Sequence, residues 1–416
     1  MTGCMRRVGP AIAGALAIGL ATSVATETAA AQWSTTFEQH YFADRSNWAF
    51  RNTYPAADRL FNAFDYGHAI LYERLYTRPN DPTSALEERE YDFITKKLLV
   101  RPPRLPLEEA AIEVQYAKLV PEAKQMFEWA HVLHRQVYDV LADEKVPLEQ
   151  KDARIARILA YYKTRPDLAF SSVPKTMDLM EGEYYALEFR KRYPKFNGLI
   201  WSYHWLQVGL YEPLMKAESL EARRAGVQAT SRRFFQMLEN APQNMPRVMP
   251  MTPAIAPTFT ARYPEIATIF DNLHGMHDVI SDILASAKVP RDQKRDVILG
   301  VAERYRDSTS YVMSRREWIE MSGMMGNNNM GGPAVDFTPE FPPPTVERGA
   351  TMAEAMKAMG HDHGTPSAGP QAPTAAPGDT TSPPAAAPRE PAPATPSPDS
   401  TSAKPPTPAA GHVHPQ

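Results

Sequence analysis

The sequence predicts an all-α protein, a pseudo-two-fold helical bundle built from an internal tandem duplication, with a disordered proline-rich C-terminal tail. A stretch with the pattern aromatic, acid, x, x, His, x, x, His occurs at 127–134 and again at 270–277. Aligned without a gap, residues 103–162 and 246–305 are identical at 19 of 60 positions, where chance gives roughly four. Moreover, no segment alternates polar and apolar residues with the two-residue period of a half-buried strand.

The chain of 416 residues begins with the features of a secretory signal peptide, which we expect to span residues 1–31. Arg6 and Arg7 precede a short apolar run, and the small residues at 29–31 form a cleavage site. This predicts transport across the inner membrane into a bacterial periplasm, with cleavage favoured over retention as an anchor. The only cysteine, Cys4, lies in this segment, which excludes disulfides, thiolate-bound metals and covalently attached haem from the mature protein.

Composition and motifs also exclude several classes of function. The 45 Lys and Arg residues nearly balance the 48 Asp and Glu residues, so the charge gives no indication of a nucleic-acid partner. The sequence contains no Gly-x-Ser-x-Gly nucleophile motif, no glycine-rich phosphate loop and no His-Glu-x-x-His zinc-protease motif.

Residues 32–53 are expected to form an N-terminal arm, and residues 54–173 the first helical repeat. Pro55 stands where a first helix begins, a position that proline tolerates. Ser84 and Glu87 have the spacing of a capping box and predict the start of a second helix. Apolar residues at helical spacing predict two further helices in this repeat, at 121–144 and 149–163.

The second helical repeat is expected over residues 174–318. Apolar spacing predicts helical segments around 177–189 and 199–214, followed by a basic amphipathic helix at 219–238. The second copy of the histidine motif then forms a helix, and a last helix is predicted at 291–317.

Residues 319–416 are dominated by Pro, Ala, Thr and Ser, with a Gly, Asn and Met segment at their start. Such a composition cannot bury enough apolar surface to fold, so a disordered tail is expected. Met352, Met356 and Met359 share one helical face beside His361 and His363. We interpret this segment as a docking site for a protein partner, such as a membrane-bound complex; a copper site is the alternative.

Six of the eleven histidines fall in the helical body, on or beside the apolar faces of predicted helices. These six residues, which we call the histidine layer, are His68, His131, His134, His204, His274 and His277. A buried imidazole needs a partner for each ring nitrogen, or the orphan group costs about 1–3 kcal/mol. Six histidines at similar depth therefore predict one shared polar centre.

An acidic residue precedes three of these histidines by three positions. These acids are Asp65, Glu128 and Asp271. On a helix, this spacing places the carboxylate and the imidazole on one face, where they can bind one metal or each other. Asp139 and Asp282 lie about two turns beyond His131 and His274 and are expected to orient the imidazoles as hydrogen-bond acceptors.

Glu128-x-x-His131 and Asp271-x-x-His274 resemble, in motif logic alone, the di-iron carboxylate bundles of the ferritin-like group. The resemblance implies one additional carboxylate from each half. The candidates are Glu73 or Asp65 in the first half and Glu183, Glu188 or Glu212 in the second. The chain departs from that pattern because one acid is Asp, each motif has an extra histidine, and the spacings between helices are longer.

These features predict a buried His/carboxylate centre that binds a transition metal, with a dinuclear arrangement favoured, for redox chemistry or metal handling. The predicted ligands are Glu128, His131, His134, Asp271, His274, His277, His68 and His204. Iron, copper, manganese and zinc all suit such a set, and the sequence does not choose between them.

Two other interpretations remain open. Histidines from four helices could hold non-covalent haem b, with neighbouring Trp, Tyr and Met residues as the porphyrin wall. Alternatively, the histidines form a structural hydrogen-bond layer in a non-catalytic accessory subunit, which serves as a scaffold in a membrane-bound electron-transfer complex.

Overall fold

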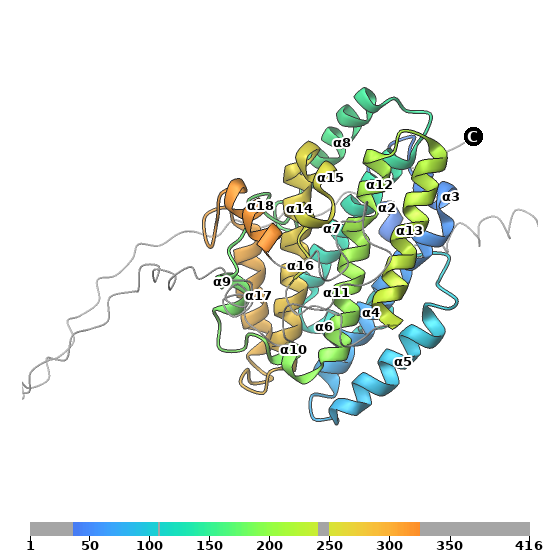
Figure 1. Ribbon diagram of the computed structural model, residues 1–416. Helices are drawn as coiled ribbons and strands as arrows, with labels where there is room; N and C mark the ends of the chain where they lie inside the picture. Colours follow the sequence, from blue (N-terminus) through green and yellow to red (C-terminus); the bar gives the residue numbers. More distant parts are fainter. Residues whose placement is uncertain (1–35, 107–108, 240–248, 325–416) are drawn as a thin grey trace, which may run out of the picture. The chain divides into compact units, whose positions relative to one another are not determined.

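The computed structural model describes residues 36–106, 109–239 and 249–324, and the elements of this body are helical (Figure 1). The all-α prediction is confirmed: in these ranges β-pairing is limited to one isolated bridge, between Lys175 and Val312. None of the described helices combines the length and the apolar character needed to span a bilayer. The predicted signal peptide and the predicted docking segment of the tail lie outside the described residues.

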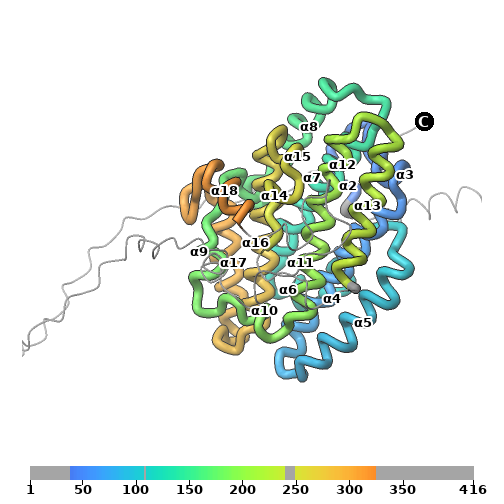
Figure 2. Tube along the Cα trace, viewed as in Figure 1, coloured from blue at the N-terminus to red at the C-terminus, as the bar shows by residue number. Residues whose placement is uncertain are grey.

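Four helices carry the histidine layer. They are α4 (Pro55–Thr77), α7 (Pro121–Ala142), α11 (Pro194–Gly209) and α16 (Pro264–Ala285). Each begins with a proline in its first turn, where the missing N–H breaks no hydrogen bond. Helix α16 packs against α4 and α7, and α11 packs against α4, so the four helices form the centre of the body (Figure 2).

Other elements surround this centre. In the first half they are α2 (Thr36–Gln39), α3 (Ala49–Thr53), η1 (Ala85–Glu90), α5 (Tyr91–Phe93), η2 (Ile94–Leu98), η3 (Glu109–Ala111), α6 (Val114–Leu119) and α8 (Leu148–Tyr162). In the second half they are α9 (Asp178–Glu181), α10 (Glu188–Arg192), α12 (Tyr211–Lys216), α13 (Leu220–Glu239), α14 (Thr252–Ile255), α15 (Pro257–Arg262), α17 (Lys294–Arg306) and α18 (Arg315–Met324).

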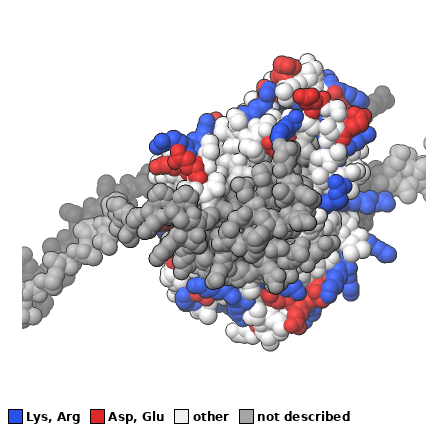
Figure 3. Space-filling view, in the orientation of Figure 1, with Lys and Arg blue, Asp and Glu red and all other residues white. Residues whose placement is uncertain are grey.

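The covering elements explain why the central helices are buried. Helices α3 and α8 pack on α7, α10 and α17 pack on α16, and α13 packs on α11. Every residue of α11 from Phe196 to Gly209 is buried, as expected for a helix that is apolar on all sides. On the face shown in Figure 3, acidic and basic side chains are interspersed around the grey segments, in keeping with the small net charge of −3.

Several local predictions are wrong. The segment around 177–189, predicted to be helical, holds only α9 and the start of α10. Ser84 makes no capping hydrogen bond, and the Glu87 carboxylate instead accepts the backbone N–H of Phe196 at 3.0 Å. The predicted last helix, 291–317, is divided into α17 and α18 because Asp307 accepts the backbone N–H groups of Thr309 and Ser310, both at 2.7 Å. Helix α18 also continues to Met324, past the predicted start of the tail at 319.

Asp139, predicted to orient an imidazole, instead holds the N-terminus of α3. Its two carboxylate oxygens accept the backbone N–H groups of Trp48 and Phe50 at 2.8 and 2.9 Å. Trp48 has a left-handed backbone conformation, with φ of 68°. The carboxylate thereby satisfies two of the N–H groups that a helix leaves unpaired at its start.

Asp282 makes the corresponding contacts in the second half. It accepts the backbone N–H groups of Leu187 and Phe189, at 2.9 and 2.8 Å, at the start of α10. Leu187 is also left-handed, with φ of 66°. The carboxylates of Asp139 and Asp282 therefore fix the segments that enter α4 and α11, and both lie outside the hydrogen-bonding shell of the histidines.

Replacing Asp282 by alanine is expected to lower the free energy of unfolding by about 2–3 kcal/mol, because two buried N–H groups lose a charged acceptor. Asp139→Ala should have a similar effect. Urea unfolding measures both, with Asp292→Ala as the control, since Asp292 is exposed and should shift stability by less than about 0.5 kcal/mol. An Asp282→Ala protein as stable as this control would contradict the assignment.

Candidate metal centre

The six residues of the histidine layer all lie in the interior of the body. His68 comes from α4, His131 and His134 from α7, His204 from α11, and His274 and His277 from α16. Their exposed fractions are between 0 and 2 %. The sequence-based expectation that these histidines lie at similar depth therefore agrees with their positions.

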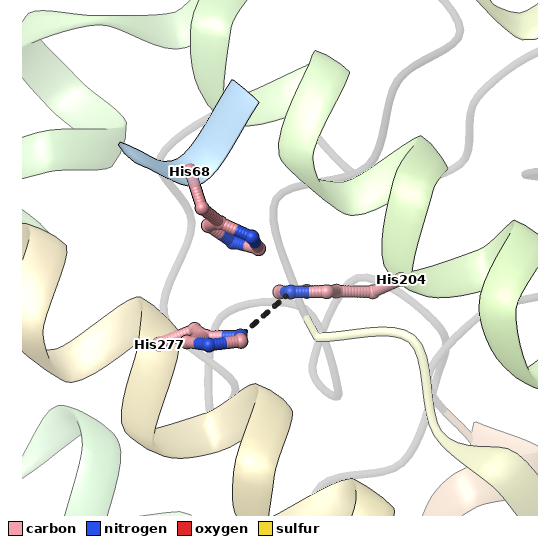
Figure 4. Close-up of side chains that lie close together, drawn as sticks. All are labelled: His68, His204 and His277. Carbon is pink, nitrogen blue, oxygen red and sulfur yellow. Dashed lines mark hydrogen bonds between the residues drawn. The ribbon is translucent and has the colours of Figure 1, made fainter. Parts of the chain in front are cut away.

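The imidazole rings contact one another across helices. The rings of His68 and His277 have centroids 4.2 Å apart, and those of His204 and His274 are stacked at 4.2 Å. His204 Nε2 and His277 Nδ1 are 3.2 Å apart and share a hydrogen bond (Figure 4). His131 joins the group through His277, with the centroids 5.9 Å apart.

Three of these rings converge closely enough to hold one metal ion. His68, His204 and His277 each offer a ring nitrogen, and the three nitrogens lie within 4.8 Å of one another. Figure 4 shows the three side chains pointing toward a common point from α4, α11 and α16. The three helices thus supply one potential ligand each.

Phenylalanine rings pack around the layer and keep it apolar. Phe64 lies edge-on against His68 with the centroids 4.1 Å apart. Phe127 contacts His277 at 4.0 Å, and Phe270 stacks on His134 at 3.8 Å. These contacts fix the orientation of the imidazoles and surround their nitrogens with groups that cannot accept or donate a hydrogen bond.

Only some of the imidazole nitrogens have a hydrogen-bond partner among the described residues. His134 Nδ1 bonds the Tyr211 hydroxyl at 2.6 Å, and His274 Nε2 bonds the Gln207 side-chain oxygen at 3.1 Å. Both nitrogens of His68 and of His131 have no hydrogen-bond partner among the described residues, and neither has His204 Nδ1. Each orphan group costs about 1–3 kcal/mol unless a ligand satisfies it.

Burial keeps these rings neutral. It lowers the pKa of all six imidazoles below the usual value, and lowers that of His274 to about 3. A neutral imidazole has one ring nitrogen with a free lone pair, which is the form that binds a metal. The layer is therefore in the protonation state that metal binding requires.

A second group of potential ligands lies beside the histidines. A carboxylate oxygen of Asp65, one of Glu109 and a ring nitrogen of His131 lie within 4.8 Å of one another. His131 Nδ1 is 3.9 Å from Asp65 Oδ1 and 3.7 Å from Glu109 Oε1. Arg135 donates to the other oxygen of Asp65 at 2.8 Å. Burial raises the pKa of Asp65 and, more strongly, that of Glu109.

The structure does not bring Glu128 and Asp271 to the histidines. Glu128 pairs with Lys124 one turn earlier on α7, and its side chain is 29 % exposed. Asp271 accepts the N–H and hydroxyl of Thr252 at 2.9 and 2.6 Å, and the indole N–H of Trp318 at 2.8 Å. Both acids are thus engaged elsewhere, and the two Glu-x-x-His-like elements do not form ligand pairs.

Among the candidates for the additional carboxylates that the resemblance implied, Asp65 approaches a histidine of the layer, with Oδ1 3.9 Å from His131 Nδ1. Glu73 accepts the backbone N–H groups that begin α6, and Glu212 those that begin α15. Glu183 pairs with Arg304, and Glu188 with Lys288, each at 2.7 Å.

Sequence reasoning missed Glu109 as a neighbour of the layer. It lies in η3, within an irregular connection where helical periodicity gives no information about side-chain direction. Gln207 and Tyr211 were also missed as partners of His274 and His134. Gln207 could have been found, because it is a polar residue at the position one turn after His204 on an otherwise apolar helix.

The rings are too close together for the haem interpretation. In bis-imidazole haem, the iron and the porphyrin plane lie between the two ligand rings. Here His204 and His277 are in direct contact through their nitrogens at 3.2 Å, and Phe64, Phe127 and Phe270 fill the space beside the rings. The geometry gives no support to haem.

No protein-family model, no curated protein and no solved structure matches this chain.

Proposed function

We propose that the protein binds a transition-metal ion through His68, His204 and His277 and uses it for electron transfer or metal handling. The observation that carries this proposal is the convergence of three buried ring nitrogens from three helices. Neither nitrogen of His68 has a hydrogen-bond partner among the described residues. A bound ion supplies that partner.

The distances fit metal coordination. A separation of 3.2 Å between His204 Nε2 and His277 Nδ1 corresponds to an angle of about 100° at a metal with bonds of about 2.1 Å, close to tetrahedral. Three imidazoles suit copper or zinc, and of these copper supports a redox role. Burial separates the ion from solvent and from substrates, a setting that favours outer-sphere electron transfer over substrate turnover.

The proposed setting is the periplasm. It is supported by the sequence at residues 1–31, where Arg6 and Arg7 precede an apolar run and a small-residue cleavage site. In this setting the proline-rich tail would connect the helical body to a protein partner, for which a membrane-bound complex is our candidate.

A second candidate is an accessory subunit in which the layer is a structural hydrogen-bond network. It is favoured by three observed bonds, His204 to His277, His134 to Tyr211, and His274 to Gln207. It gives no role to His68, which is buried and makes no such bond. This residue therefore separates the two candidates.

Metal analysis of natively purified full-length protein tests the proposal. We expect about one equivalent of copper or zinc per chain, and loss of most of it in His277→Leu. His40→Ala is the matched control, because His40 is exposed and should leave the metal content unchanged. Less than about 0.1 equivalent of any transition metal, also after incubation with copper or zinc, would favour the structural network instead.

A further inference from the structure

The group formed by Asp65, Glu109 and His131 has the properties of a second ligand set. It draws one side chain each from α4, η3 and α7, and the exposed fractions of the three residues are 2, 6 and 1 %. The separations from His131 Nδ1, 3.9 Å to Asp65 and 3.7 Å to Glu109, are too long for hydrogen bonds. The three ligand atoms lie within 4.8 Å of one another, close enough to contact one cation between them.

Unsatisfied polar atoms point to a missing ligand at this place. Both ring nitrogens of His131 and Oδ1 of Asp65 are buried without a hydrogen-bond partner among the described residues. Each such group costs about 1–3 kcal/mol. A single cation between these atoms would satisfy the carboxylate oxygen and one nitrogen together.

The surrounding charges orient the ligands. Arg135 binds Oδ2 of Asp65 at 2.8 Å, which leaves Oδ1 facing His131. Glu113, one turn after Glu109, is also buried and adds a third carboxylate nearby. Arg135 and the buried Lys124, which also pairs with Glu128, supply two positive charges near Asp65 and three glutamates. An added divalent cation therefore reduces a charge imbalance that burial makes costly.

We propose that Asp65, Glu109 and His131 bind a second divalent cation, of the manganese or ferrous-iron class. Two carboxylates and one imidazole form a harder ligand set than three imidazoles and favour such ions. This inference deepens the proposed function. It rests on that function in one respect, because the first metal is the one proposed at His68, His204 and His277. The two sites share no ligand, but His131 contacts His277, with the ring centroids 5.9 Å apart, and both sites take a ligand from α4.

The second half of the chain offers an internal comparison. Glu73 caps α6 and Glu212 caps α15 through matching pairs of backbone bonds, which supports an alignment of the two halves. When Glu73 is aligned with Glu212, Asp65 corresponds to His204. In the ungapped alignment of 103–162 with 246–305, Glu109 corresponds to Thr252 and His131 to His274. The corresponding set contains no carboxylate, so we expect one site of the harder class in the body and not two.

Manganese binding to chelator-treated full-length protein tests the second site. Electron paramagnetic resonance of free Mn²⁺ should show about one Mn²⁺ bound per chain, weakened at least about tenfold in Glu109→Gln and in Asp65→Asn. Glu122→Gln is the control, because Glu122 lies on the same helix as His131 but pairs with Arg295, and its side chain is 52 % exposed. It should leave the affinity unchanged. Melting curves show whether each variant is folded.

The outcomes separate this site from the first one. His68→Leu should lose zinc binding and keep Mn²⁺ binding. If His68→Leu loses Mn²⁺ while Glu109→Gln keeps it, the ion sits among the histidines and the second site is wrong. Wild-type protein that binds no Mn²⁺ also overturns it, whether or not the variants fold. Wild-type protein that binds Mn²⁺ but neither copper nor zinc overturns the proposed function and leaves the second site standing.

Discussion

Replacing His68 by leucine is expected to abolish the stabilisation that the bound metal provides, without destabilising the metal-free protein. A ligand that binds only the folded state at about a thousandfold above its Kd stabilises that state by about 4 kcal/mol. His68 supplies one of three proposed ligands, so its loss should remove most of this term. Thermal or urea unfolding with and without zinc measures the difference for wild type and variant.

The metal-free comparison rests on the orphan nitrogens of His68. Because neither nitrogen has a partner among the described residues, leucine removes two unsatisfied polar groups from the interior and adds none. The metal-free variant should be as stable as wild type, or more stable by about 1–3 kcal/mol. The structural-network candidate gives no role to His68 and predicts no zinc-dependent stabilisation of the wild type, so this substitution would then have nothing to remove.

His274→Leu is the matched control. It removes an equally buried imidazole that does bond a partner, the Gln207 side chain at 3.1 Å, and that is not one of the three proposed ligands. We expect it to destabilise the metal-free protein by about 1–3 kcal/mol and to keep the stabilisation by zinc. If His68→Leu and His274→Leu behave alike in both measurements, the proposed metal site is contradicted.

The helical elements that carry the layer could be predicted because their signals are local. Prolines 55, 121, 194 and 264 mark the first turns of the four central helices, and apolar residues at helical spacing define the buried face. A histidine on such a face must enter the interior, wherever the helix packs. The depth of all six histidines therefore follows from the sequence.

The roles of the acids could not be predicted from the same periodicity. A carboxylate three residues before a histidine shares its side of the helix, but the partner that it chooses depends on groups far away in sequence. Asp271 binds Trp318, 47 positions later, and Asp139 binds the backbone of Trp48, 91 positions earlier. Glu128 pairs with Lys124, a local pair that the spacing allowed.

Irregular segments also limited what could be predicted from the sequence. Glu109 enters the centre from a short η3 turn, and the break between α17 and α18 depends on side-chain bonds from Asp307 to the following backbone. Neither feature produces a periodic pattern in the sequence. A capping box at Ser84 and Glu87 was plausible by spacing, but Glu87 finds a better partner in the N-terminus of α11.

Replacing Arg135 by leucine is expected to lower the free energy of unfolding by about 3–5 kcal/mol, because the change leaves a buried carboxylate without its cation. Arg135 is 4 % exposed and binds Asp65 at 2.8 Å. It also lies 3.6 Å from Asp58, and its guanidinium stacks over the ring of Phe61 at 4.2 Å. Leucine keeps part of the packing volume and removes all of the charge. Urea unfolding of the metal-free protein measures the loss.

A second substitution shows whether the loss comes from the buried charge. In Asp65→Asn/Arg135→Leu the carboxylate is absent, so the double variant should be more stable than the sum of the single effects predicts, by about 0.5–3 kcal/mol. Arg165→Leu is the control for an exposed pair: Arg165 binds Asp167 at 2.7 Å, and both side chains are about half exposed. Its loss should cost less than about 1 kcal/mol. If Arg135→Leu and Arg165→Leu lower the free energy of unfolding equally, Asp65 is not held as a charged group in the interior. The second cation site would then lose the contact that orients Asp65.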